Sequence, residues 1–148
     1  MNKITFFVPG EPKPQGRPRA FKNGGFAKVY SPLTEWRCTV LKYASDQLEK
    51  CEQLTGPLSV SIRYFFARPR SHFGTGKNSG ILKSSAPDSH ISRPDLDNLN
   101  KAILDAIGDS GLIQNDSQID VLESQKKYCD GLMKPGAFIE IITTNKGE

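Results

Sequence analysis

Residues 58–67 read LSVSIRYFFA, and this stretch decides the fold class. Every second residue from Leu58 to Phe66 is large and apolar, whereas serine and arginine fill most of the positions between them. Successive side chains of a β-strand point to opposite faces, so the alternation predicts a strand that buries one face. Thr55-Gly56-Pro57 breaks the chain just before it, so we expect the strand to begin close to Leu58.

A helix is expected on the N-terminal side of this strand, over residues 32–52. Ser31 can cap this helix, and Pro32 suits its first turn, where a backbone N–H would have no partner in any case. Trp36 is expected in the core. The apolar residues recur at helical spacing, namely Trp36, Val40, Leu41, Ala44 and Leu48.

A long polar segment, residues 69–92, follows the strand and is rich in glycine and serine. We predict a flexible loop here, and loops of this length inside a compact domain are often functional. Residues 95–107, DLDNLNKAILDAI, predict a second helix that Gly108 can end, with Gly111 opening another turn. Its buried face is expected to carry Leu96, Leu99, Ile103 and Ile107.

The remaining segments complete a mixed sheet. Residues 2–9 and 137–143 predict strands, and the Pro- and Gly-rich residues 10–31 predict a loop or a loose hairpin. Residues 118–128 fit a strand with Ile119 and Val121 on one face, although a helix is an alternative there. The expected order is β-α-β-loop-α-β-β. We therefore predict a single small α+β domain over residues 1–148, with a mixed sheet packed against two main helices.

Composition narrows the class of protein. The chain has 148 residues, of which 36% are hydrophobic and 24% charged, which suits one globular domain. No apolar run approaches the ~20 residues of a membrane span, and the first residues turn polar too early for a secretory signal. Three cysteines without a CxxC spacing favour reduced thiols in the cytoplasm; these are Cys38, Cys51 and Cys129.

Charge is distributed unevenly along the chain. The formal net charge is +4, but residues 1–30 and 61–93 each hold six Lys or Arg against one acid. Residues 94–125 reverse this balance, with seven acids against Lys101 alone. Two basic stretches around one acidic stretch suggest a polyanion-binding surface around an acidic pocket. The alternative is chance clustering of charges in solvated loops.

The acidic stretch contains a possible metal site. Asp95 and Asp97 lie at the start of the second helix, where negative charge is favoured, and Lys101 follows Asp97 by one turn. Asp116 could complete the site from the next loop. Mg²⁺ takes hard oxygen ligands and keeps waters for reaction, and a nearby lysine can stabilise negative charge. The structural alternative makes Asp95 an N-cap, Asp97 and Lys101 a surface ion pair, and Asp116 a turn residue.

Two quoted motifs resemble a known family. PDLDNLNKAILDAI at residues 94–107, followed by GLIQNDSQID at residues 111–120, resembles the signature of the RusA family of Holliday junction resolvases. The N-terminal VPGEPKPQGRPRA and the late Pro135-Gly136 also fit the ends of that family. The resemblance implies a small, homodimeric, Mg²⁺-dependent endonuclease of the bacterial cytoplasm, often encoded by a prophage, that acts on four-way junctions and other branched DNA.

The resemblance also assigns roles to individual residues. The three metal-site acids of the family fall on Asp95, Asp97 and Asp116, and its catalytic lysine falls on Lys101. The metal, with Mn²⁺ as a possible substitute, would activate water for attack on a phosphodiester while Lys101 stabilises the developing charge. Asn115 departs from the acidic pair that many members carry at this point.

Basic residues outside this site are candidates for DNA contact. Lys13, Arg17 and Arg19 lie in a proline-rich loop that cannot bury them, which favours contact with phosphate. Arg93 and Lys127 are further candidates, although Lys127 and its neighbour Lys126 could instead protect a sheet edge. Two further residues have open roles: His90, which could contact phosphate, and Phe73, which could stack on a base or simply pack locally.

Two other functions fit the same residues. A non-catalytic DNA-binding module could keep the fold without cleaving DNA. A small metal-dependent phosphohydrolase could act on nucleotides, and it should show little salt-dependent affinity for DNA.

Overall fold

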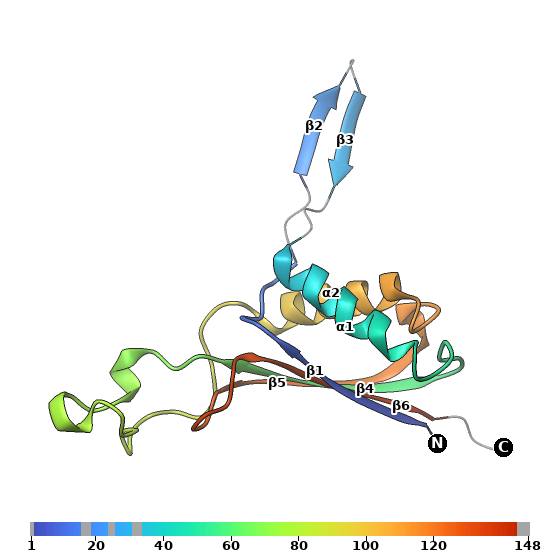
Figure 1. Ribbon diagram of the computed structural model, residues 1–148. Helices are drawn as coiled ribbons and strands as arrows, with labels where there is room; N and C mark the ends of the chain where they lie inside the picture. The colour runs from blue at the N-terminus through green and yellow to red at the C-terminus, as the bar shows by residue number, and fades with distance from the viewer. Residues whose placement is uncertain (1, 16–18, 24–25, 31–33, 145–148) are drawn as a thin grey trace.

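The computed structural model describes residues 2–15, 19–23, 26–30 and 34–144, with only the backbone described between residues 19 and 30. Two layers make up the body of the molecule, namely a four-stranded sheet and a pair of helices that covers one face of it (Figure 1). This arrangement confirms the predicted α+β class.

The sheet has the strand order β1-β6-β4-β5. Its strands are β1 (Lys3–Pro9), β6 (Gly136–Thr143), β4 (Leu58–Phe66) and β5 (Ile119–Tyr128). β4 and β5 pair in parallel and the other pairs are antiparallel, so the sheet is mixed, as predicted. Parallel neighbours need a crossover connection, and here a helix provides it.

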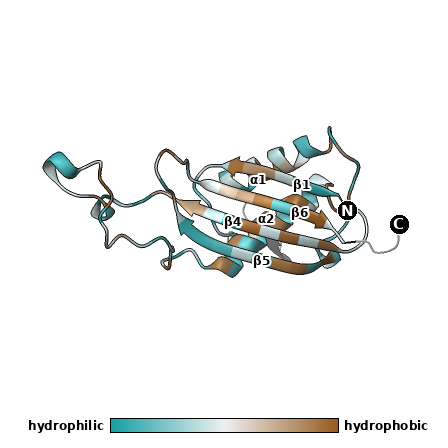
Figure 2. Ribbon diagram, turned by 90° about the horizontal axis from the view of Figure 1, so that it is seen from below, coloured by the Kyte–Doolittle hydropathy of each residue, from teal (hydrophilic) through white to brown (hydrophobic). Residues whose placement is uncertain are grey.

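Helices α1 (Glu35–Gln47) and α2 (Leu96–Ser110) pack against each other and on the sheet. The alternating apolar residues of β4 are all buried beneath them, as the sequence predicts. Trp36 belongs to the same core. The sheet face away from the helices is seen directly in Figure 2. The molecule therefore presents one covered sheet face and one open one.

Two segments extend from this body. β2 (Arg19–Asn23) and β3 (Phe26–Tyr30) pair antiparallel as a two-stranded sheet of their own, which confirms the hairpin alternative for residues 10–31. The second is the predicted loop 69–92, which reaches away from the end of β4 and returns to α2 (Figure 1). It contains two short 3₁₀ turns, at Arg70–His72 and Gly76–Asn78.

The predicted helix boundaries are wrong at two points. α1 begins at Glu35, and the side chain of Thr34 caps it by accepting a hydrogen bond from the N–H of Arg37. Ser31 and Pro32 therefore lie before the helix and outside the described residues.

Gly108 does not end α2, which continues to Ser110. Gly111 takes the left-handed conformation that a helix C-terminus commonly needs, with φ of +82°. A side-chain contact also holds the last turn of α2, because the guanidinium of Arg37 in α1 donates to the carboxylate of Asp109 over 2.6 Å.

β5 is a strand, so the helical alternative for residues 118–128 is wrong. The prediction that Ile119 and Val121 share a face is also wrong. A register irregularity pairs Ile119 with Leu58 but Val121 with Ser59. Leu58 and Ser59 are adjacent in β4, so their side chains point to opposite faces of the sheet. Ile119 consequently packs against the core, whereas Val121 is 45% exposed.

No helix within the described residues is long and apolar enough to cross a membrane.

Candidate active site at the start of helix α2

Two of the predicted acids lie at the first turn of α2. Asp95 occupies the N-cap position in extended conformation, and Asp97 lies in the first turn. Both residues are exposed. The carboxylate of Asp95 makes no capping hydrogen bond, so it does not satisfy the free N–H groups of this helix end. The positive end of the helix dipole favours negative charge at this position.

Lys101 lies one turn further along α2 and is also exposed. Among the described residues, no ion pair or side-chain hydrogen bond involves the side chain of Asp95, Asp97 or Lys101. Two parts of the structural alternative are confirmed, because Asp95 occupies the N-cap position and Asp116 lies in a 3₁₀ turn. However, the side chain of Asp95 makes no capping hydrogen bond, and Asp97 forms no ion pair with Lys101. Their charged groups are free to face a ligand.

A pocket of about 780 Å³ lies beside these residues. Asp95, Asn98 and Lys101 line it from α2, the segment Glu11–Gln15 lines it from the exit of β1, and Phe66 and His90 line its inner part. Lys13 and Arg93 add two cations to the lining. The pocket thus combines carboxylates with three cationic side chains, which suits a phosphate group bound close to a metal ion.

A partly buried hydrogen-bond chain fixes α2 against the sheet. The hydroxyl of Tyr64 on β4 donates to Asn100 Oδ1 over 2.8 Å, and Asn100 Nδ2 donates to Ser124 Oγ of β5 over 2.8 Å. Burial raises the pKa of Tyr64 well above its usual range, so its hydroxyl stays protonated and remains a donor. Asn100 stands between Asp97 and Lys101, and its bonds therefore fix the rotation of the turn that carries them.

A second anchor holds the chain that enters α2. Lys126 Nζ donates to the carbonyl oxygens of Ser92 and Pro94, over 2.6 and 2.8 Å. β5 is an edge strand, and Lys126 uses its charge to position the residues just before Asp95. Lys127 pairs beside Phe65 on the opposite face and is exposed. The two adjacent lysines thus differ, because only Lys127 is free for an external partner.

His90 lies at the inner end of the pocket and is 9% exposed. Its ring stacks on Phe66 with centroids 4.0 Å apart, and its Nδ1 is buried without a partner. Burial lowers the pKa of His90, and the charge of Lys126 lowers it further. The neutral form of His90 is therefore favoured at pH 7, which argues against an ion pair between His90 and a phosphate.

Asp116 lies at the other end of α2. The helix has fifteen residues and spans about 22 Å, and Asp116 follows its C-terminal end on a 3₁₀ turn capped by Asn115. Gln118 ties that turn to the carbonyl oxygens of Leu54 and Gly56, near the start of β4, whereas Asp95 lies near its end. Within the described residues no three acidic, histidine or cysteine side chains gather as a metal site. The structure therefore does not bring Asp116 to Asp95 and Asp97 within one chain, and the role of Asp116 at the metal site stays a prediction.

A larger hollow, of about 970 Å³, lies between the start of β1 and the connection from α1 to β4. Its only carboxylate is Glu52. It lacks the convergent charged groups of the α2 pocket, so we place the candidate active site at α2.

A family model described as "Endodeoxyribonuclease RusA" matches residues 9–142, which is nearly the whole chain. The chain belongs to the RusA endodeoxyribonuclease family. It is also similar to a protein of Bacillus subtilis (strain 168) named "Uncharacterized protein YqaN". The two are 27% identical over 136 residues, which cover 88% of this chain and 91% of that protein. Membership of the RusA family confirms the resemblance and implies nuclease activity on DNA.

The structure describes the side chains of three of the five predicted DNA-binding residues of this RusA-family chain. Lys13 and Arg93 line the pocket, and Lys127 is exposed on the open sheet face. Arg17 lies outside the described residues, and Arg19 is described only as the first backbone position of β2.

Sequence reasoning missed the residues that position the site. Asn100 was passed over because it is an ordinary polar residue among charged neighbours, and its partner Tyr64 lies 36 positions away in the chain. Lys126 was considered only for DNA contact or edge protection. The one sequence signal that could have identified Asn100 is its position as a polar residue on an otherwise apolar helix face.

Proposed function

We propose that this protein is a Mg²⁺-dependent endodeoxyribonuclease that cuts branched DNA, including four-way junctions, and that it acts as a homodimer in the bacterial cytoplasm. One observation carries the proposal. Asp95 and Lys101 line a cationic pocket at the start of α2, and Asp97 lies in the first turn of the same helix. None of the three side chains makes a hydrogen bond or ion pair within the described residues.

The residues present fit a magnesium ion. Mg²⁺ in phosphoryl-transfer sites is held by one or two carboxylates together with substrate phosphates and waters. Asp95 and Asp97 supply two exposed carboxylates without protein partners. When bound there, the ion would supply a water of lowered pKa and neutralise charge on the scissile phosphate. Mn²⁺ has similar ligand preferences and is expected to substitute.

The remaining chemistry belongs to the side chains of the chain itself. Water attacks the phosphorus atom, the bond to the leaving oxygen breaks, and negative charge grows on the phosphoryl oxygens. Lys101 is placed to stabilise that charge, and Lys13 and Arg93 are placed to hold the flanking phosphates. Asn100 and Lys126 act indirectly, because they fix the turn that carries the carboxylates.

Asp116 joins the site only if a second copy of the chain provides it. One chain places Asp116 a helix length away from Asp95, so its carboxylate cannot reach a metal ion at the start of the same α2. A two-fold dimer with antiparallel α2 helices would bring Asp116 of each copy toward Asp95 and Asp97 of the other. Such a dimer has two sites, which matches the two symmetric cuts that a four-way junction needs.

Cleavage of defined DNA tests the activity. We expect the purified protein to cut a labelled four-way junction in Mg²⁺, to cut matched duplex or single strand much less, and to cut none of them in EDTA. Binding without cleavage in any divalent metal would favour the non-catalytic module. Hydrolysis of free nucleotides without salt-dependent DNA binding would favour the phosphohydrolase.

Mixing two inactive variants tests the shared site. Asp97→Asn and Asp116→Asn should each abolish cleavage, but a heterodimer of the two contains one site with all its acids intact. We therefore expect the refolded mixture to recover nicking of one strand. If each site lies within a single chain, the mixture stays inactive.

A further inference from the structure

The segment 69–92, here called the arm, has an internal structure of its own. Phe73 and Leu82 form a β-bridge, and Lys83 N–H donates to the carbonyl of His72 over 2.8 Å. Gly74 is packed so closely that an added Cβ would lie 2.6 Å from the Cβ of Asn78. These contacts fold the outer half of the arm into a compact turn rather than leaving it as an extended loop.

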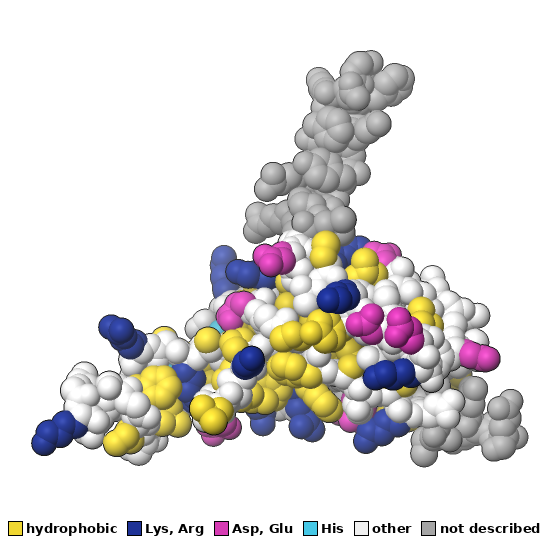
Figure 3. All heavy atoms as spheres, in the orientation of Figure 1, with side chains coloured by type: hydrophobic (Ala, Val, Ile, Leu, Met, Phe, Trp, Pro, Cys, Tyr) yellow, Lys and Arg dark blue, Asp and Glu magenta, His cyan; other side chains and the backbone are white. Residues whose placement is uncertain are grey.

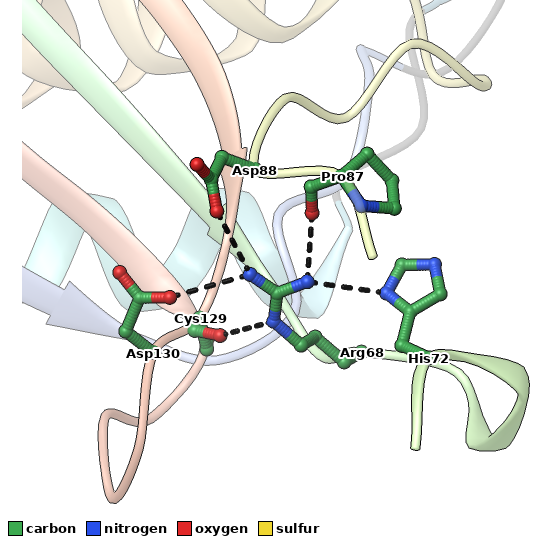
Figure 4. Close-up of polar contacts among 6 residues, drawn as sticks. All are labelled: Arg68, His72, Pro87, Asp88, Cys129 and Asp130. Carbon is green, nitrogen blue, oxygen red and sulfur yellow. Dashed lines mark hydrogen bonds and ion pairs between the residues drawn. The ribbon is translucent and has the colours of Figure 1, made fainter. Parts of the chain in front are cut away.

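Arg68 fixes the arm to the body (Figure 4). Its side chain is only 4% exposed. It donates to the carbonyl oxygens of Cys129 and Pro87 over 2.8 and 2.7 Å, and it pairs with Asp88 and Asp130 over 3.4 and 3.2 Å. One guanidinium thus joins the start of the arm, its return and the end of β5. The arm is held in a defined direction at the same end of the sheet as Asp95.

The outer part of the arm is cationic and carries exposed apolar side chains. Ile81 and Leu82 are 60% and 42% exposed. The same segment carries Arg70, Lys77 and Lys83, and residues 69–87 contain no Asp or Glu. Figure 3 shows basic side chains at the free end of the arm with hydrophobic ones beside them. Exposed aliphatic residues bounded by cations, on a fixed support, need a partner that offers both negative charge and an apolar surface.

We propose that the arm binds DNA at a branch point, with Ile81 and Leu82 against the exposed base pair and the arm cations on the flanking phosphates. The inference rests on the proposed action on branched DNA. Small apolar side chains are the type that proteins insert at base steps, and stacking is already interrupted at a branch. From Arg68 to Lys77 the arm can reach at most ~30 Å, which is about nine steps along a strand of B-DNA.

A second copy of this chain is a poorer occupant for the same surface. Stable protein interfaces bury about 800 Å² on each partner, far more than two aliphatic side chains provide. The arm also carries only like charges over residues 69–87, so two arms facing each other would repel. DNA meets both requirements, because phosphates pair with the cations and the base surface accepts the aliphatic side chains.

Binding in EDTA tests the arm independently of cleavage. For the variant Ile81→Ser/Leu82→Ser we expect the affinity for a four-way junction to fall roughly tenfold, toward that for duplex, while duplex affinity is unchanged. For Arg70→Gln/Lys77→Gln/Lys83→Gln we expect weaker binding to all DNA, with the slope of log K against log salt reduced by roughly 0.9 for each lost contact. Leu132→Ser, at a fully exposed leucine outside the arm, is the matched control and should change neither quantity.

A fluorescent base analogue at the junction centre gives a second measurement. Wild-type protein should raise the fluorescence of 2-aminopurine at the branch, because unstacking relieves quenching, and the Ile81→Ser/Leu82→Ser variant should not. Unchanged junction selectivity and unchanged fluorescence in that variant would overturn the proposal. If the variant sedimented as a monomer where the wild-type protein is a dimer, Ile81 and Leu82 of the arm would contact a second copy of the chain, and the proposal would also be overturned. A protein that binds junctions through the arm but never cuts DNA would refute the nuclease activity and leave the arm proposal intact.

Discussion

The two ends of helix α2 carry similar residues but use them differently. At the C-terminal end Asp109 pairs with Arg37, and Asn115 and Gln118 form a reciprocal capping box. At the N-terminal end Asp95 and Asp97 are exposed and have no such partner. At the C-terminal end the carboxylate of Asp109 ties α2 to α1, whereas the side chains of Asp95 and Asp97 at the N-terminal end make no contact that ties α2 to another element.

This difference separates structural from functional charge. An acid that stabilises the packing of two elements is expected to have a partner, whereas an unpaired acid at a helix start gains only from the helix dipole. The acids at the start of α2 have no side-chain partners, while the neighbouring Asn100 and Lys126 bond α2 and the residues before it to the sheet. Asp116 is exposed like them, although it lies at the opposite end. Exposure and lack of partners therefore group it with Asp95 rather than with Asp109.

The largest effect is expected from Asp97→Asn. Removing a metal-binding carboxylate should lower the cleavage rate roughly a thousandfold or more, because several kcal/mol of transition-state stabilisation depend on the bound ion. Affinity for a junction in EDTA and the free energy of unfolding should change little. Asp109→Asn, an acid of the same helix, is the control and should keep full activity. Equal activity in the two variants would remove the functional distinction between the ends of α2.

Lys101→Ala should lower the cleavage rate about a hundredfold, since one donor to a developing oxyanion is lost. Single-turnover kinetics should show the loss in the chemical step, with binding of junction DNA nearly unchanged. Lys50→Gln, at an exposed lysine beyond the end of α1, is a charge-matched control. A loss of affinity without a loss of rate would make Lys101 a phosphate contact only.

Asn100→Ala should lower the free energy of unfolding by about 1–3 kcal/mol, because it leaves the buried hydroxyl of Tyr64 without its acceptor. Chemical denaturation followed by circular dichroism measures the change. Replacing both partners with apolar residues, as Tyr64→Phe/Asn100→Leu, should cost less than the single variant. A more destabilised double variant would mean that packing, rather than the hydrogen bond, dominates this contact.

The smallest effect is expected at the C-terminal end of α2. Asp109→Asn breaks the ion pair with Arg37, and we expect a loss below about 1 kcal/mol because the aspartate side chain is 58% exposed. The loss should shrink further in high salt. A larger loss of unfolding free energy that did not depend on salt would show that the Arg37–Asp109 pair is effectively buried. Asp109 would then differ even more from the unpaired Asp95 and Asp97.

The sequence predicted those features that depend on neighbouring residues. Strand β4 and the buried face of α2 follow from apolar periodicity, which reports on a single element. The sequence groups Asp95, Asp97 and Lys101 because two acids meet at a helix start and Lys101 follows Asp97 by one turn. Asp116 was a candidate from the next loop, and the family motif supported it, but spacing along the chain could not tell on which side of the fold it lies.

Tertiary structure alone decided where the helices end and which polar side chains have hydrogen-bond or ion-pair partners within the fold. Gly108 and Gly111 look equivalent in sequence, but α2 continues through Gly108 to Ser110, and Gly111 takes the left-handed conformation that ends it. Arg68 reads as one more basic residue, yet it is the buried anchor of the arm through contacts with residues as many as 62 positions away. Such pairings depend on which strands become neighbours. The sequence therefore determined the elements and the chemistry of the site, whereas the fold selected which charges remain free to act.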